Sequence, residues 1–443
     1  MATSRTIQIT PENVGLGHEK RSEAAAKKTT ELLQDDLEKH HCYFNDKGYH
    51  NHISHQLLSL YALGASPEQI QKGYDDNASY QRSLYEIDPV AIAELQDFEK
   101  AKAKLGKEKY YTDFLAFFQA EIDAKGWEGA LLEHLFKGDA RSEDLLVRMF
   151  AGVIHPIIQL MYGIEWRQPA VVAMALAQAA VHDDCMKEFL IGAEEAAAAR
   201  GKAATPMPEI AALFPRVEGD MLATGIAHLS IGMPDHDTAH VRAFNDAIRV
   251  AAEVRIAPDE LDARTVEMYN TSIYQAAAAA IRPGKEPRFD FFLMHHVNVC
   301  PLFLAINAQD WIPTAAKVRL LEWKIRFDLL QYAGRQCAPV SIDKITSYVP
   351  KEKTRKPTAD LMPRIFALHD DGHVSKLIRA LSICQDISKK YEDQPWLKIK
   401  GDALWAKLNQ MVVDSVEGDG PTWVRGAGED GAWKEVPDRQ EGS

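Results

Sequence analysis

Three histidines lie within six residues in the run Gly48-Tyr49-His50-Asn51-His52-Ile53-Ser54-His55. An apolar stretch that is typical of a helix follows directly. If that helix is already wound at His52, then His52 and His55 lie on one face, where two imidazoles can share a metal ion. A single histidine near a helix start is more often a surface or hydrogen-bonded core residue. Because three occur together, the run predicts a metal site.

Further histidines interrupt apolar segments. His155 stands in the run Val153-Ile154-His155-Pro156-Ile157-Ile158, and Pro156 is predicted to kink or interrupt that helix and to free a backbone carbonyl. His295 and His296 end another apolar run, and we expect one of them to face the core without the periodicity deciding which. For each of these residues taken alone, the alternative is a hydrogen-bonded core histidine.

A third dense patch ends in His373 and Lys376. Gly372 permits a turn, His373 opens a helix, and Lys376 lies beside it on the same face. A cation beside a metal site is unfavourable unless the amine reacts with CO2 to form a carbamate, which is an anionic oxygen ligand. The alternative is a surface lysine paired with Asp370 or Asp371. Neutral imidazoles with at most one carboxylate-like ligand suit iron, zinc, copper or nickel more than magnesium or calcium.

The elements that must position these side chains are helices. Helical patterns separated by short Gly- or Pro-bearing joints cover nearly the whole chain, and Ser66-Pro67-Glu68-Gln69 has the features of a capped helix start. The one stretch with strand character is Ile345–Val349. We therefore predict an all-α fold, with a single large multi-helix domain over 1–416 around a buried His-rich site. Residues 417–443 are predicted to form an extended tail that docks on this body, because they include Trp423 and Trp433.

The composition narrows the class of protein. The chain has 443 residues, of which 46% are hydrophobic and 26% charged, which is enough for a large core. A net charge of -13 argues against nucleic-acid and anionic-membrane surfaces, since both need clustered Lys and Arg. No apolar run approaches the ~20 residues of a membrane span, and no secretory segment stands at the N-terminus. Five widely spaced cysteines do not indicate a disulfide scaffold. We expect a soluble, cytoplasmic protein without nucleic-acid or membrane partners.

No Rossmann loop, Walker loop, nucleophile elbow or His-Glu-x-x-His motif is present, so redox chemistry would come from a metal or from a cofactor held without a recognisable motif. The histidine-bearing segments, in their order from about His40 to Trp433, resemble the questin oxidase-like proteins of fungal polyketide pathways. The pieces that carry the resemblance are His50–Ala65, His155-Pro156, Tyr162–Glu165, Leu176–His182, Phe291–His295, Asp370–Lys376 and Trp423–Gly428 with Trp433. One departure is Gln56, where another histidine is expected. It puts a substrate or supporting role at that position in doubt, but not the metal.

Members of this family oxidatively open the ring of anthraquinones and related polyketides. Some are Baeyer–Villiger-type oxidases, and some resemble non-heme iron dioxygenases with a His-rich centre. The resemblance therefore implies Fe(II), O2 and an aromatic polyketide as substrate. It also implies a ligand set of His52 or His55, His155, His295 and His373, with Lys376, carbamylated, as an anionic fifth ligand.

The same resemblance suggests acid/base or orienting roles for His182, Glu165 and Tyr49, each of which could equally be a core hydrogen-bonding residue. Three alternatives stay open. The first is an NADPH-dependent Baeyer–Villiger-type oxidase acting on the same substrates. The second is an HD-type metal phosphohydrolase, which would use the His-Asp pairs His182-Asp183, His236-Asp237 and His369-Asp370. The third is a helical scaffold without a metal.

Overall fold

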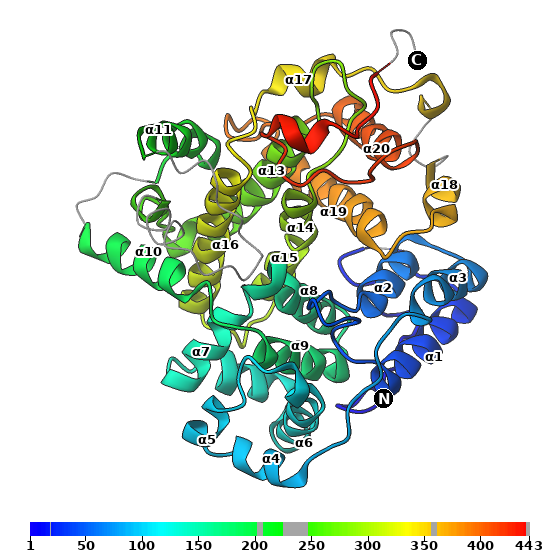
Figure 1. The fold of residues 1–443 in the computed structure, drawn as a ribbon, viewed down its shortest axis with the longest axis vertical. Coiled ribbons are helices and arrows are strands. Elements are labelled where there is room, and N and C mark those ends of the chain that lie inside the picture. The colour runs from blue at the N-terminus through cyan, green and yellow to red at the C-terminus, as the bar shows by residue number, and fades with distance from the viewer. Residues whose placement is uncertain (18, 202–206, 225–246, 356–360, 440–443) are drawn as a thin grey trace. The chain divides into compact units, whose positions relative to one another are not determined.

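The computed structural model describes residues 1–17, 19–201, 207–224, 247–355 and 361–439 (Figure 1). Helices dominate these residues, and the only β-pairings among them are isolated bridges, such as the one between Tyr43 and His50. The all-α prediction is confirmed. The stretch with strand character lies instead mostly in helix α17 (Ile342–Ser347), because the Ser341 side chain caps that helix by accepting the Asp343 N–H.

The described residues form two compact units, and the chain passes between them several times. The first unit comprises Met1–Lys187, Pro301–Pro313 and Phe366–Arg379. The second comprises Glu188–Cys300, Thr314–Ile365 and Ala380–Ser443. Within the described part of the chain no single helix is both long and apolar enough to cross a bilayer, although α7 (Ala140–Arg148) and α8 (Ala151–Glu165), bent by 101°, pass that test as a pair.

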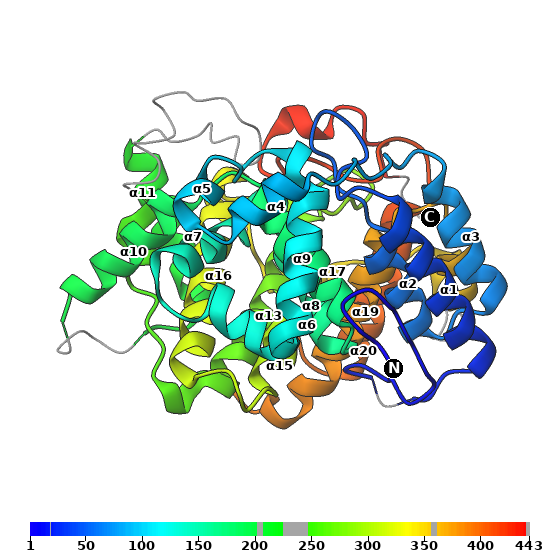
Figure 2. The same ribbon diagram turned by 90° about the horizontal axis from the view of Figure 1, so that it is seen from below.

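The first unit is built on the buried helix α9, which packs against α8 and α6 (Figure 2). Every residue of α9 from Ala170 to Val181 is buried. A second group, α1 to α3, packs together beside it, and α3 begins with the predicted capping box of Ser66 and Gln69. The helices of this unit are α1 (Glu23–Lys39), α2 (Ile53–Leu63), α3 (Pro67–Ala78), α4 (Pro89–Leu95), α5 (Phe98–Lys102), η1 (Glu108–Tyr110), α6 (Tyr111–Leu135), α7 (Ala140–Arg148), α8 (Ala151–Glu165), α9 (Pro169–Val181), α15 (Pro301–Asn307) and the first turns of α19 (His373–Ser388).

The second unit is built on α13, α14 and α16, which pack against one another. The tail is attached to this unit. Asp290 accepts hydrogen bonds from the N–H groups of Gly426 and Ala427, and Trp433 is buried with its indole N–H donating to the Ala427 carbonyl. The helices that begin in this unit or enter it are α10 (Lys187–Ala199), η2 (Ile210–Leu213), α11 (Phe214–Thr224), η3 (Pro258–Glu260), α13 (Leu261–Ala279), α14 (Phe291–Asn298), α16 (Thr314–Gly334), α17, η4 (Glu352–Thr354), α18 (Met362–Ala367), η6 (Lys389–Tyr391), α20 (Asp402–Val416) and η7 (Asp430–Trp433).

Candidate metal centre

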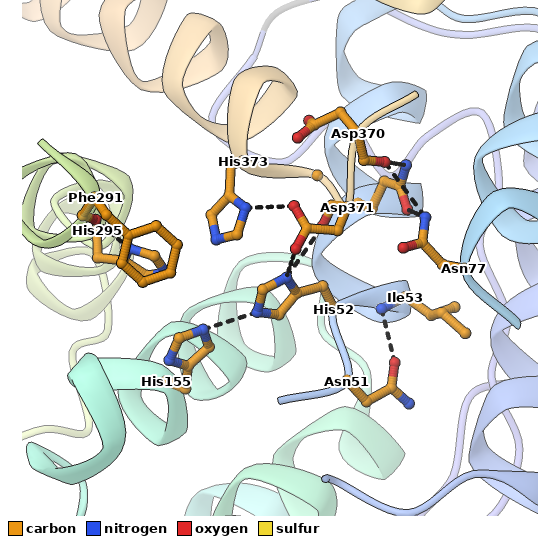
Figure 3. A network of polar contacts seen from close by, with 12 residues as sticks. Asn51, His52, Ile53, Asn77, His155, Phe291, His295, Asp370, Asp371 and His373 are labelled. Atoms are coloured by element: carbon orange, nitrogen blue, oxygen red, sulfur yellow. Dashed lines mark hydrogen bonds and ion pairs between the residues drawn. The ribbon is translucent and has the colours of Figure 1, made fainter. Parts of the chain in front are cut away.

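Three segments of the first unit bring His52, His155 and His373 together with Asp371 (Figure 3). His52 is the residue before the first turn of α2, His155 lies near the start of α8, and His373 is the first residue of α19. Possible ligand atoms of His52, Asp371 and His373 all lie within 4.8 Å of one another. The N-terminal ends of α2, α8 and α19 therefore form the site, since each of them carries one of the three histidines.

The hydrogen bonds of His52 and His155 leave two lone pairs facing each other. The Nδ1 of His155 lies 2.6 Å from the Gly152 carbonyl, so it carries the proton and the Nε2 has a lone pair. The Nδ1 of His52 lies 3.2 Å from the Asp371 carboxylate, so it also carries the proton. The two Nε2 atoms are nevertheless only 2.9 Å apart. Such a pair needs a shared cation, either a proton or a metal ion.

Burial decides between these two cations. Desolvation, helped by the charge of Lys376, lowers the pKa of His52 to about 4, so a shared proton is unfavourable at neutral pH. Histidines that ligate a metal commonly donate their second N–H to a carboxylate or a backbone carbonyl, as His52 and His155 do here. The donor set thus fits a metal bound through imidazole Nε2 atoms.

A second histidine pair stacks on the first. The Nε2 atoms of His50 and His182 are 2.8 Å apart, and the Nδ1 of His182 donates to the Gln178 carbonyl at 2.6 Å. The rings of His50 and His155 stack at 3.9 Å with only 5° between their planes. Burial lowers the pKa of His182 to about 4 and that of His50 well below its ordinary value. The result is two layers of neutral imidazoles.

A strained turn supports both layers. Gly152, Val153 and Ile154 have φ angles of 53°, 53° and 63°, in the left-handed region that β-branched residues rarely adopt. Pro156 follows in the first regular turn of α8, so the predicted interruption at Pro156 is confirmed. A Cβ at Gly152 would overlap the Nε2 of His182 and crowd that of His50. The absence of a side chain at Gly152 therefore leaves the space that the His50 and His182 rings occupy.

His55 and Lys376 are buried beside this site and lack hydrogen-bond partners. His55 is fully buried, neither ring nitrogen has a partner, and its ring lies 5.5 Å from that of Tyr162. The Nζ of Lys376 is equally buried and unpartnered, and burial lowers its pKa to about 8. The alternative of a surface lysine is therefore wrong. Of the two candidate ligands His52 and His55, it is His52 that lies close to Asp371 and His373.

Asp371 is the residue that sequence reasoning missed as part of the site. Its two oxygens contact the Nδ1 atoms of His52 and His373, and although burial opposes its charge, these histidines hold its pKa well below the ordinary value. The sequence feature that could have indicated this role is the spacing Asp371-Gly372-His373. Gly372, with a φ of 92°, permits the turn that brings the Asp371 carboxylate back to His373. Gln56, the departure from the family pattern, donates to the Asp370 carbonyl at 2.7 Å and so holds this loop.

The other predicted residues lie in different surroundings. His295 and His296 both belong to the second unit. The expectation that one of them faces the core is met by both, since both are buried, and the Nδ1 of His295 lies 2.6 Å from the Phe291 carbonyl. Glu165 is buried in the first unit, where it pairs with Arg379 and accepts the Leu16 N–H at 2.7 Å.

Three further positions bear on the predicted roles and on the phosphohydrolase alternative. Tyr49 is 40% exposed and stacks on Phe44 at 5.9 Å. His369 is exposed and lies 3.1 Å from Asp76. His236 and Asp237, a pair considered for the phosphohydrolase alternative, lie outside the described residues.

A family model described as Questin oxidase-like matches residues 49–381. The Baeyer-Villiger oxidase ptaJ of Pestalotiopsis fici is 33% identical over 448 residues, which covers 98% of this chain and 99% of that protein. The questin oxidase of Aspergillus terreus is 32% identical, with 98% of both chains covered. The Baeyer-Villiger monooxygenase dmxR6 of Cryptosporiopsis sp. is 36% identical, with 91% of this chain and 92% of that protein covered.

The predicted resemblance is thereby confirmed. The relatives are named as oxidases and a monooxygenase, in agreement with the expected enzyme class, an oxidoreductase. The matched range contains the segments that form the histidine layers, including those of His52, His155 and His373. Its extent over most of the sequence, with relatives aligned almost end to end, shows that the chain belongs to the questin oxidase-like family.

Proposed function

We propose that this protein opens the ring of a hydroxyanthraquinone-type polyketide with O2 at a non-heme iron centre. The observation that carries the proposal is the pair of Nε2 lone pairs of His52 and His155, which face each other at 2.9 Å in a buried site. Relatives named questin oxidase and Baeyer-Villiger oxidase support the oxidative reaction class and the kind of substrate. Iron(II), when bound, would supply the activation of O2.

In this proposal His52, His155 and His373, which all belong to the first unit, hold the iron. Asp371 orients two of these ligands, because its oxygens contact the Nδ1 atoms of His52 and His373. Low pKa values keep His52 neutral, so its Nε2 is available to a metal over the whole physiological pH range.

Lys376 would supply the anionic ligand. Its amine is buried, has no hydrogen-bond partner and has a pKa of about 8, so an appreciable fraction is neutral near that pH. A neutral amine adds to CO2, forming an N–C bond and releasing one proton, and the product is a carbamate. The carbamate would replace an unpaired cation by an anion beside the imidazoles.

The remaining histidines would handle protons. Because the Nδ1 of His182 donates to Gln178, the proton between His182 and His50 is held on the Nε2 of His50. His182 can therefore accept a proton that His50 gives up, which is a role in general acid/base chemistry. Burial of both rings excludes water from this path. The roles proposed for Glu165 and Tyr49 are orientation rather than proton transfer.

The test is metal content followed by turnover. Native protein purified without oxygen should hold close to one iron per chain, and His155→Ala should hold less than about a tenth of that. His134→Gln is the matched control, because His134 is a buried histidine of the first unit that pairs with Glu121 instead. Native protein supplied with a hydroxyanthraquinone and O2 should consume both. A native chain without metal would contradict the iron mechanism.

The relatives named Baeyer-Villiger oxidases favour a second candidate, an NADPH-dependent oxidase on the same substrates. The two candidates differ in stoichiometry. Consumption of one NADPH per ring opened would favour the second candidate, whereas product formed from O2 alone would favour the iron dioxygenase.

A further inference from the structure

The second unit buries a row of polar side chains that the metal site does not use. On α16, Asp328, Gln331 and Arg335 follow one another at helical spacing and so lie along one stripe. On α14, His296 contacts Asp328 at 2.5 Å, and Phe292, one turn earlier, lies 4.0 Å below the Arg335 guanidinium. The two helices are therefore antiparallel, and Gln331 lies at the level between these two contacts.

The third helix, α13, supplies the other side of the row. Ser272 donates to Asp328 at 3.0 Å, and Met268 contacts Lys324 one turn earlier in both helices. The same separation of 56 residues holds for both pairs, so α13 and α16 run parallel in register. Continuing that register by about one turn places Gln275 of α13 opposite Gln331 of α16.

The lower end of this row is internally satisfied. The Nζ of Lys324 lies 2.6 Å from Asp328, and His296 and Ser272 complete the hydrogen bonds of the carboxylate. The upper end is not. From the level of Asp328 upward, four buried atoms have no hydrogen-bond partner: the Nε2 of His296, the Nε2 of Gln275, the Oε1 of Gln331 and the Nε of Arg335.

Unpartnered buried polar atoms are costly, and four of them along one stripe between α13, α14 and α16 call for a ligand. Gln275 and Arg335 offer N–H donors. Gln331 offers a carbonyl acceptor, and the Nε2 of His296 is also an acceptor because its Nδ1 proton points to Asp328. A group that matches this set needs an oxygen acceptor with partial negative charge and a hydroxyl donor close to it.

We propose that this polar layer on α13, α14 and α16 is a binding subsite for the adjacent carbonyl and phenol groups of an oxygenated aromatic substrate. The class of ligand rests on the function proposed above. Arg335 and Gln275 bind the carbonyl oxygen, and Gln331 and His296 accept the hydroxyl proton. A buried guanidinium favours a carbonyl oxygen that carries negative charge, as in a conjugated hydroxyquinone.

The test compares two probes on the whole protein without oxygen, so that no turnover occurs. The probes are 1,8-dihydroxyanthraquinone, which has the carbonyl–phenol edge, and 9,10-anthraquinone, which lacks the hydroxyls; binding is followed by absorbance titration. Native protein should bind the dihydroxy probe at least about tenfold more tightly, the value of roughly one charge-assisted hydrogen bond. Gln331→Leu and Arg335→Met should bring the two affinities to within about threefold. Gln385→Leu, a change outside the polar layer, should keep the native ratio.

The thermal midpoint and the iron content are measured on the same variants. The thermal midpoint of Gln331→Leu should equal or exceed that of the native protein, because the change removes an unpartnered buried amide. A Gln331→Leu protein that keeps the native ratio of affinities, or that loses both probes equally, would overturn the subsite. Iron content is measured on the same samples. A native chain without iron but with the Gln331-dependent preference would fail the proposed function and leave the subsite standing.

Discussion

Each of the two units buries a cluster of titratable side chains, and the two clusters are stabilised in different ways. In the second unit, Lys324, Asp328 and His296 form a charged group whose carboxylate is bonded on all sides within the protein. In the first unit, the imidazoles of His52 and His155 present lone pairs to each other, and Lys376 has no partner. The charges of the second-unit cluster are balanced within the chain, whereas the first-unit cluster requires a cation and an anion from outside it.

This difference predicts opposite responses to the same kind of substitution. A buried charge that has a partner becomes costly when the partner is removed, whereas removal of a buried charge without a partner relieves its desolvation cost. Removing a lysine should therefore weaken the second unit and strengthen the first. All stability comparisons below refer to protein that has been freed of metal.

The largest effect is expected for Lys324→Met. The change leaves Asp328 buried without its cation, and breaking a buried pair in this way costs about 3–5 kcal/mol of unfolding free energy. Urea unfolding at pH 7 measures it. The double variant Lys324→Met with Asp328→Leu should recover most of the loss, since neither charge then remains. A single variant as stable as the native protein would break the contrast between the units.

Acid should act mainly on the first unit. His52 and His182 have pKa values of about 4 in the folded state, below the 6.5 of an exposed histidine, so the unfolded chain binds protons first as the pH falls. Each residue should therefore cost about 2 kcal/mol of unfolding free energy at pH 5 relative to pH 7.5. Unfolding of the native protein and of His182→Gln at both pH values measures the effect. An equal loss in the two proteins would contradict it.

The sequence predicts the fold far better than it predicts the site. Helical periodicity, the capping box at Ser66 and the break at Pro156 are local properties, and the structure confirms each of them. The first unit instead combines three distant segments of the chain, and no local pattern shows that the Asp371 loop lies against His52.

The histidines show the same limit. The apolar surroundings of His155 and His295 predicted burial, which is confirmed for both. Nothing in the sequence indicated that His50 pairs with His182, because 132 residues separate them. The polar layer of the second unit was missed for a related reason. Gln275 and Gln331 are ordinary helix residues until the packing of α13 and α16 buries them.

A smaller effect of opposite sign is expected for Lys376→Met. Burial lowers the pKa of this amine from 10.5 to about 8, so its charge destabilises the fold at every pH below 8 and no longer does so above 10.5. Replacement by methionine should raise the unfolding free energy by about 3 kcal/mol at pH 7 and by progressively less as the pH rises. The same protein should fail to retain iron. Loss of stability at pH 7 would show that Lys376 has a partner like that of Lys324.

The smallest effect is expected for alanine substitutions at two glycines, which distinguish backbone strain from displacement of the His50 and His182 rings. Gly152 and Gly126 both have left-handed φ angles, 53° and 73°, but a Cβ at Gly126 would meet nothing within 4 Å, whereas one at Gly152 would overlap His182. Gly126 combines φ 73° with ψ 159°, a region that only glycine populates readily, so Gly126→Ala should cost about 2 kcal/mol of backbone strain alone. Gly152→Ala should cost about 1 kcal/mol for its left-handed backbone and, in addition, the overlap with His182. Urea unfolding gives both values. Iron content gives the sharper contrast, because only Gly152→Ala displaces His182 and the His50 ring, which stacks on His155. If both variants kept the native iron content, the stacked pair would be shown to have no part in holding the metal-binding layer.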